Sequence, residues 1–482
     1  MCSTFGAALC AILLRADMFP LEGGYPSYSP DGRKLLFQQE RPEGMVLGVC
    51  DFEDRCVGYV CGRGNSAQAA WHPTDGSFVY VFGDEAQTAK EGFFAKERTG
   101  WNLRRWRNGR ATPLTSGRFM DYTPCFSPDG RHVYFASTRV PVGPGRTSGT
   151  VLYRVPTDGG EPEQLTDYAG NSSGVSMPSF SPDGRCLLWA ELESAFGAWH
   201  LVVAPASNLR RTCRIGAPDL VAYSPRWSPD GRVVCCTGFR AGDPGWCVYL
   251  IDPRTGADRR LFPGREPCIA PDGQRLAYVL DGKIREHLLT QDELPPAGKV
   301  KSSPPIPGGR PLVVAEKPVA DDQIDLPADC AFGDDRTFYV RFTGVAPASN
   351  VVVGAQCAFA GRYAEHDLGF QIVFHNGGIC SFALRTATGE YFAVPASGRI
   401  RWGEPVEIVG IRHRGVAYIS VNGSTPRAME LPSTLNLRTP RFIEVMPPYH
   451  GVRPVCSIAR IEVGSGWPAA VERPCTLEEV FR

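Results

Sequence analysis

One four-residue turn, Ser-Pro-Asp-Gly, recurs through the first 280 of the 482 residues and limits what this chain can fold into. It stands at Ser29–Gly32, Ser127–Gly130, Ser181–Gly184 and Ser228–Gly231, and in altered form at His72–Gly76 and Ala270–Gly273. In a tight turn Pro presets φ at the second position, Asp suits the third, and Gly accepts the left-handed conformation that closes a hairpin. Each copy therefore predicts two antiparallel strands joined by a short turn.

The spacing of these turns predicts a repeating unit of four strands. The turn aspartates at positions 31, 75, 129, 183, 230 and 272 lie 44, 54, 54, 47 and 42 residues apart. One period contains four strand-like runs, for example residues 122–126, 131–136, 150–155 and 163–166. A period of about 40 to 50 residues with four strands is that of a β-propeller blade. We therefore expect a six-bladed β-propeller over residues 10–290.

The repeated motif also resembles that of a known family. The pattern Pro-x-aromatic-Ser-Pro-Asp-Gly-Arg is similar to the WD-like repeat of TolB-type propellers, which also form the non-catalytic domain of prolyl-oligopeptidase-like peptidases. The resemblance covers roughly residues 15–290. It implies the fold and leaves the function open, because propellers carry many unrelated activities.

The amino terminus allows two interpretations. Residues 5–14 form an apolar run that resembles the core of a signal peptide, with Ala16 at a possible cleavage site, although no Lys or Arg precedes the run. The sixth repeat, however, has only three strands after Glu266, so its outer strand must come from elsewhere in the chain. Residues 12–16 could supply that strand and close the ring. The first interpretation favours a periplasmic or extracellular protein, and the second a cytoplasmic one.

The remainder of the chain predicts a second all-β domain. Residues 291–325 are rich in Pro and read as an extended linker. Residues 326–466 contain short alternating runs and hairpin turns such as Asn422-Gly423, which predict a jelly-roll β-sandwich. This domain resembles laminin-G and concanavalin A-like modules, which implies glycan or protein recognition, sometimes through Ca²⁺. The acidic residues from Asp321 to Asp335 lack calcium-loop spacing, and residues 467–482 predict a tail with one short helix.

Composition excludes several classes of function. Lys plus Arg and Asp plus Glu both number 51, so the chain has no excess of positive charge that would indicate nucleic-acid binding. No apolar stretch reaches the length of about 20 residues that crosses a bilayer. The 17 cysteines form no zinc-type pattern, and we expect no cofactor or metal. Apolar surroundings predict buried thiols at Cys125, Cys186, Cys235, Cys236, Cys268 and Cys380, while Cys50, Cys56 and Cys61 leave room for one hairpin disulfide.

Two catalytic patterns carry little weight. Ser172 lies in a Gly-x-Ser-x-Gly match, but the segment reads as a loop between blades, without the buried strand and following helix of a nucleophile elbow. Glu191 and Glu193 share one face of a strand at its fraying end, where solvated carboxylates are common. We assign no catalytic residue.

The residues that begin the inner strands form the predicted binding site. In a propeller these positions converge on one mouth of the central channel. They stand four residues before each turn Ser or its counterpart and are Tyr25, Gln68, Thr123, Met177, Ser224 and Glu266. Arg226 joins them, because it occupies a position where the other repeats carry Ser, Ala or Cys. A long charged side chain there requires either an internal ion pair or a ligand.

Three functional hypotheses follow. The first is a non-catalytic binding or scaffold protein, in which the propeller docks a protein partner and the sandwich contacts a glycan or protein. The second is a carbohydrate-active enzyme with its site in the propeller mouth or on the concave face of the sandwich. Paired carboxylates about 5 to 10 Å apart would favour this enzyme. The third is a cytoplasmic propeller scaffold.

Overall fold

The computed structural model is almost entirely β and divides into two compact units. The first contains residues 1–167, 171–302 and 475–482, and the second contains 168–170 and 303–474. The structure describes residues 18–42, 44–60, 65–83, 100–139, 149–166, 174–192, 198–217, 219–296, 308–320, 322–326, 337–346, 356–364, 367–375, 379–385, 391–396, 400–401, 403–413, 415–424, 426–431, 442–445, 457–469, 471, 473 and 477–481. Among these residues no helix is long and apolar enough to span a membrane.

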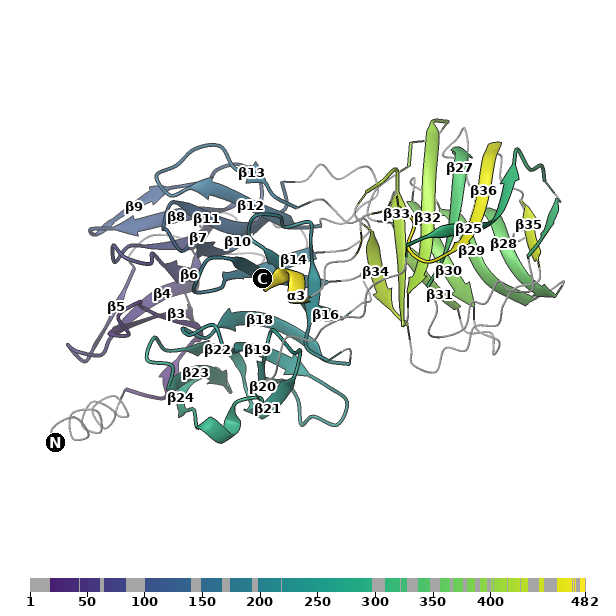
Figure 1. Cartoon of the computed structure of the whole chain (residues 1–482). Coiled ribbons are helices and arrows are strands. Elements are labelled where there is room, and N and C mark those ends of the chain that lie inside the picture. Colours follow the sequence, from purple (N-terminus) through teal and green to yellow (C-terminus); the bar gives the residue numbers. More distant parts are fainter. Residues whose placement is uncertain are drawn as a thin grey trace. The chain divides into compact units, whose positions relative to one another are not determined.

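The first unit is a ring of six four-stranded antiparallel sheets, which confirms the predicted propeller (Figure 1). Blade 1 is β2 (Gly24–Tyr28), β3 (Lys34–Arg41), β4 (Gly44–Asp51) and β5 (Cys56–Tyr59); blade 2 is β6 (Asn65–Trp71), β7 (Phe78–Gly83), β8 (Trp101–Arg107) and β9 (Arg110–Pro113); blade 3 is β10 (Asp121–Phe126), β11 (His132–Ser137), β12 (Val151–Pro156) and β13 (Glu163–Gln164). Blade 4 is β14 (Gly174–Phe180), β15 (Cys186–Leu192), β16 (Trp199–Pro205) and β17 (Cys213–Ile215); blade 5 is β18 (Val221–Trp227), β19 (Val234–Phe239), β20 (Cys247–Ile251) and β21 (Asp258–Pro263). Blade 6 is β22 (Arg265–Ile269), β23 (Arg275–Leu280), β24 (Lys283–Leu288) and β1 (Leu21–Glu22), and the 3₁₀ turn η1 (Gln291–Glu293) follows it.

The strand that closes the ring lies later in the chain than the sequence suggested. The outer strand of blade 6 is β1, in which Leu21 faces Ile284 and Glu22 faces Lys283. Residues 12–16, the predicted closing strand, lie outside the described residues. Because β1 comes after Ala16, cleavage after Ala16 would leave the closing strand in place, so export and closure of the ring are compatible.

The predicted buried thiols are observed, five of them in the blades and one in the sandwich. Cys125, Cys186, Cys235, Cys236, Cys268 and Cys380 are all buried and carry free thiols. Burial raises the pKa of Cys125 to about 12, so this thiol stays protonated at neutral pH. Cys56 is free and exposed, whereas Cys61 lies outside the described residues, and the hairpin disulfide stays a prediction.

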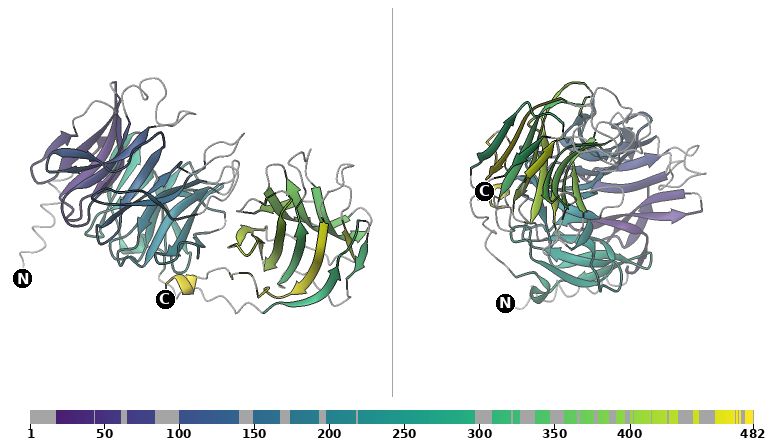
Figure 2. Two further views of the ribbon diagram at one scale, coloured as in Figure 1. Left: turned by 90° about the horizontal axis from the view of Figure 1, so that it is seen from above. Right: turned by 90° about the vertical axis from the view of Figure 1, so that its right-hand side faces the viewer.

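The second unit is a sandwich of two six-stranded sheets (Figure 2). One sheet is ordered β25 (Arg310–Glu316), β36 (Ser457–Ser465), β27 (Phe338–Val345), β32 (Pro405–His413), β33 (Val416–Val421) and β34 (Arg427–Glu430). The other is ordered β26 (Gln323–Asp325), β35 (Phe442–Val445), β28 (Gln356–Ala364), β29 (Asp367–His375), β30 (Ile379–Arg385) and β31 (Tyr391–Pro395). Phe342, Phe374 and Ile408 belong to the core between them.

Two strands of this sandwich occupy the segment that was predicted to be a linker. β25 pairs with β36, and β26 pairs with β35. The segment that contains them is rich in Pro, so its local composition predicted an extended linker. Pairing with the distant strands β36 and β35 instead places them in the two sheets. The linker prediction over residues 291–325 is therefore wrong for residues 310–316 and 323–325.

The carboxyl-terminal segment contains the predicted short helix, α3 (Leu477–Val480), and it packs on the propeller. Val480 is buried in the cluster formed by blades 4 and 5, and its carbonyl oxygen accepts a bond from Cys186 Sγ at 3.6 Å. The ring of Phe481 lies 6.4 Å from that of Trp227. The chain thus leaves the propeller, forms the sandwich and returns to the propeller with its last residues.

Candidate functional site

The six predicted mouth residues share one unusual backbone conformation. Their φ angles are all positive: 51° at Tyr25, 44° at Gln68, 48° at Thr123, 57° at Met177, 54° at Ser224 and 54° at Glu266. Each lies where the pairing of an inner strand with its neighbour shifts register, which marks a β-bulge. A left-handed residue other than Gly costs about 1 kcal/mol or more, so such a conformation persists only where the surroundings enforce it.

A proline accompanies nearly every bulge and explains how the strand tolerates it. A bulge leaves one extra residue outside the ladder of hydrogen bonds. Pro follows the bulge residue in five blades, at Pro26, Pro124, Pro178, Pro225 and Pro267, and Ala69 takes this place in blade 2. Because Pro has no backbone N–H, no donor is left unpaired at that position. The repeated X-Pro pair is therefore the sequence signal of the bulge.

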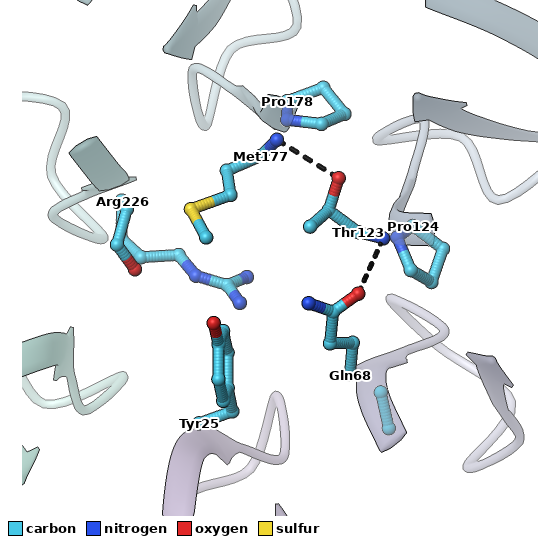
Figure 3. Close-up of a pocket in the computed structure, with 9 residues that line it drawn as sticks. Tyr25, Gln68, Thr123, Pro124, Met177, Pro178 and Arg226 are labelled. Atoms are coloured by element: carbon cyan, nitrogen blue, oxygen red, sulfur yellow. Dashed lines mark hydrogen bonds between the residues drawn. The ribbon is translucent and has the colours of Figure 1, made fainter. Parts of the chain in front are cut away.

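Side chains from one blade stabilise the bulge of the next. Gln68 Oε1 accepts the Thr123 N–H at 3.0 Å, and Thr123 Oγ1 accepts the Met177 N–H at 3.0 Å (Figure 3). Between blades 6 and 1, Glu266 Oε2 accepts the Tyr25 N–H at 2.7 Å. Gln38 and Thr237, which the sequence did not single out, act similarly on Gln68 N–H at 3.1 Å and Glu266 N–H at 2.8 Å. The mouth residues thus form part of the structural ring.

Arg226 is the basic residue among the seven predicted residues. The structure brings six of the seven predicted residues, Tyr25, Gln68, Thr123, Met177, Ser224 and Arg226, around one cavity, together with Ala69, Pro124 and Pro178. Figure 3 shows the Arg226 guanidinium extending into the space between Tyr25 and Gln68. Within the described part of the chain it forms no ion pair, which leaves the predicted internal partner unidentified.

The cavity itself is small. Its volume is about 20 Å³, roughly the space that one water molecule needs. Small organic ligands require pockets of about 300 Å³ or more. This cavity therefore accommodates a single small group.

Glu266 is the seventh predicted residue and the one that titrates near neutral pH. Burial raises its pKa to about 7, although the Tyr25 N–H and the charges of Arg265 and Arg226 oppose that shift. Burial also raises the pKa of Tyr25, and the Glu266 charge adds to that effect. The site therefore contains a neutral phenol, a carboxyl group that changes charge near pH 7, and a permanent cation.

This set of groups does not include an acid and base pair. Glu266 is the only carboxyl group among the seven predicted residues, whereas glycoside hydrolysis commonly requires two. Among the described residues there is no group of three or more His, Cys, Asp or Glu side chains placed to hold a metal ion. Ser172, Glu193 and Asp321 lie outside those residues, as do Asp329, Asp334 and Asp335.

Comparisons with known proteins support the propeller. No protein-family model matches the chain. It is 28% identical over 122 residues to the Tol-Pal system protein TolB of Anaeromyxobacter dehalogenans, which covers 24% of this chain and 27% of that protein. The TolB homolog of Chlorobium luteolum is 28% identical over 155 residues, or 31% of this chain and 33% of that protein. An uncharacterized Bacillus subtilis peptidase, YuxL, is 38% identical over 82 residues, 17% of this chain and 11% of the peptidase.

Solved structures with a similar arrangement include two TolB proteins. TolB from Acinetobacter baumannii has a TM-score of 0.40 and 18% identity over 57% of this chain and 62% of its own. Putative TolB from Agrobacterium tumefaciens has a TM-score of 0.40 and 20% identity over 56% of this chain and 91% of its own. The alignments with the TolB sequences span about a quarter to a third of those relatives. With its repeated turns and its six four-stranded sheets, the first unit is a six-bladed propeller that is similar to TolB proteins over part of its sequence.

Proposed function

We propose that this protein is a non-catalytic docking protein whose propeller binds a partner protein over the mouth of its channel, around Arg226. The observation that carries the proposal is a guanidinium projecting into a cavity too small for an organic ligand. A protein surface can cover such a mouth and insert one small group. The relatives named as Tol-Pal system proteins support a protein partner rather than a substrate.

The chemistry of the mouth indicates what the partner presents. A guanidinium binds carboxylates through paired N–H donors, and does so more strongly where water is excluded. Ionised Glu266 would compete for Arg226, because its charge is felt there. A partner that inserts a carboxylate should therefore bind more tightly below pH 7, where Glu266 becomes neutral.

Site-specific photo-crosslinking in cells of the source organism tests this docking surface. A crosslinker at Met177, in the mouth, is expected to capture a defined partner, and Arg226→Gln should reduce the yield at least tenfold. A crosslinker at Glu163, on the exposed outer strand β13, provides the matched control. Equal capture from both positions, or a yield that Arg226→Gln leaves unchanged, would rule out the channel mouth.

Two finer parts of the proposal have their own tests. Export of the protein is supported by the apolar run at residues 5–14 and is compatible with the position of β1. Amino-terminal sequencing of protein from the native cell decides it, since cleavage after Ala16 gives a mature chain that starts at Asp17. Glycan recognition by the sandwich stays a prediction from sequence, and a glycan array probed with the full chain would reject it if no glycan bound.

A further inference from the structure

A second cavity lies between blades 2 and 3, away from the channel residues. Its volume is about 310 Å³, which falls at the lower end of the range for small-molecule sites. The lining residues are His72, Asp75, Arg105, Arg107, Gly130, Arg131, Pro156, Thr157 and Asp158. The proposed docking function uses none of them.

The cavity lies beside the turn of blade 2, whose sequence departs from the Ser-Pro-Asp-Gly pattern. In blade 3 the Ser127 N–H bonds the carbonyl of His132, and Asp129 accepts from Ser127 Oγ at 2.6 Å. In blade 2 the equivalent bond joins His72 and Ser77, so Thr74 takes the place of Asp129. Asp75 therefore stands one residue later than sequence alignment of the turns suggested. This shift directs its carboxylate toward strand β8.

Arg105 on β8 forms an ion pair with that carboxylate. Strand pairing places Arg105 where blades 1, 4 and 5 carry Val49, Val203 and Leu250, and where blades 3 and 6 carry the charged residues Arg154 and Glu286. Its side chain is only 7% exposed and bonds Asp75 Oδ2 at 2.7 Å. A buried guanidinium is costly unless it is paired, so the ion pair with Asp75 stabilises Arg105 inside the fold.

Arg105 Nε also donates to Ser77 Oγ of blade 2 at 3.2 Å, and its other partners belong to blade 3. Its Nη1 donates to the Thr157 carbonyl at 3.3 Å and to Asp158 Oδ1 at 2.8 Å. The Asp158 side chain is nevertheless 92% exposed. Ion pairs with so exposed a carboxylate contribute little, about 0 to 1 kcal/mol. Asp158 is thus a carboxylate that another oxyanion can replace at Arg105.

Two further arginines line the same cavity with most of their donors directed to solvent. The side chains of Arg107 and Arg131 are 54% and 81% exposed. Arg107 lies 3.6 Å from Asp75, and Arg131 lies 3.9 Å from Asp129. The lining holds three guanidinium groups, of Arg105, Arg107 and Arg131, and two carboxylates, of Asp75 and Asp158, so it favours a negatively charged ligand.

We propose that this cavity is a binding site for a small organic oxyanion, such as a carboxylate or phosphate compound. Arg107 and Arg131 hold the charged group, and the ligand replaces the Asp158 carboxylate at Arg105. The cavity volume suits a ligand of the size of a sugar acid or sugar phosphate.

Isothermal titration calorimetry of the full chain at low ionic strength tests the site, with inorganic phosphate and malonate as separate probes. Saturable binding of at least one probe is expected, and which of the two binds identifies the oxyanion. The double variant Arg107→Gln/Arg131→Gln should weaken binding at least tenfold. The double variant Arg33→Gln/Arg232→Gln is the matched control, because it removes the same charge from two exposed turn arginines of other blades.

A second variant separates ligand binding from a purely structural ion-pair cluster. Asp158→Asn removes the competing carboxylate, so the probe should bind several-fold more tightly and raise the melting temperature of the variant more than that of the parent chain. The site is rejected if neither probe binds, if the control pair weakens binding as much as the cavity pair, or if Asp158→Asn lowers stability without tightening binding.

Discussion

At the scale of single residues, the ring of left-handed residues serves structure and function together. The side-chain oxygens of Gln68 and Thr123 each accept a hydrogen bond from a backbone N–H of the following blade. These bonds explain why polar side chains occupy the strained positions. Arg226 makes no comparable bond to a described residue, and its guanidinium lies in the cavity. The first two residues build the mouth, and Arg226 is the group available for recognition.

Glu266 should make stability depend on pH. Its pKa is raised to about 7 in the folded protein, so the folded state holds the proton more tightly than the unfolded chain, whose carboxyl group has an ordinary pKa of about 4.3. Stability from this group is therefore fully present at low pH and is lost as pH rises toward and through 7. Glu266→Gln should flatten that fall, because Gln cannot ionise and its carbonyl oxygen can still accept the Tyr25 N–H.

Urea denaturation at pH 5 and pH 8 measures the effect. The unfolding free energy of Glu266→Gln minus that of the parent chain is expected to be larger at pH 8 than at pH 5. Glu163→Gln, at an exposed carboxylate paired with Arg154, serves as the control and should leave the pH dependence unchanged. Parallel pH profiles for the parent and Glu266→Gln would contradict the assignment.

At the scale of elements, the ring depends on a strand of two residues. β1 completes blade 6, and the Gly23 N–H donates to the Gly282 carbonyl at 3.0 Å. Met18, Phe19 and Leu21 pack against the core between blades 6 and 1. A closed ring removes the exposed sheet edge that an open sixth blade would present.

Truncation distinguishes the closing strand from the segment before it. A chain starting at Met18 should unfold like the full chain, whereas one starting at Gly24 should lose about 2 to 4 kcal/mol, since three partly buried apolar side chains are removed. Glu22→Gln, which breaks only the exposed ion pair with Lys283, should cost less than about 1 kcal/mol. Thermal unfolding of the three proteins provides the comparison, and equal stability of both truncated chains would contradict this role for β1.

At the scale of the whole molecule, each hydrophobic cluster of the described residues lies within one of the two units. The sandwich core lies within residues 338–463, and the last residues of the chain belong to the propeller unit. The sandwich is therefore inserted, in sequence, between blade 6 and the propeller's own carboxyl-terminal helix. Each unit can in principle unfold separately.

Differential scanning calorimetry of the full chain should show two transitions. Val480→Asp should lower only the one that belongs to the propeller, because it buries a charge at a side chain that is 5% exposed. Val314→Asp, at a sandwich position that is 43% exposed, should move neither transition by more than a degree or two. A shift of both transitions by Val480→Asp would show that the two units unfold as one.

The sequence by itself determined the number of blades, the positions of the mouth residues and the exceptional place of Arg226. These features are encoded locally: a Ser-Pro-Asp-Gly turn closes its hairpin, and an X-Pro pair marks each bulge, whatever lies elsewhere. Only the tertiary structure decided which segment closes the ring, that β25 and β26 join the sandwich, and that blade 2 shifts its turn to pair Asp75 with Arg105. Each of those outcomes depends on a partner from another part of the fold, and short-range patterns carry no information about which distant strand or charge will be adjacent.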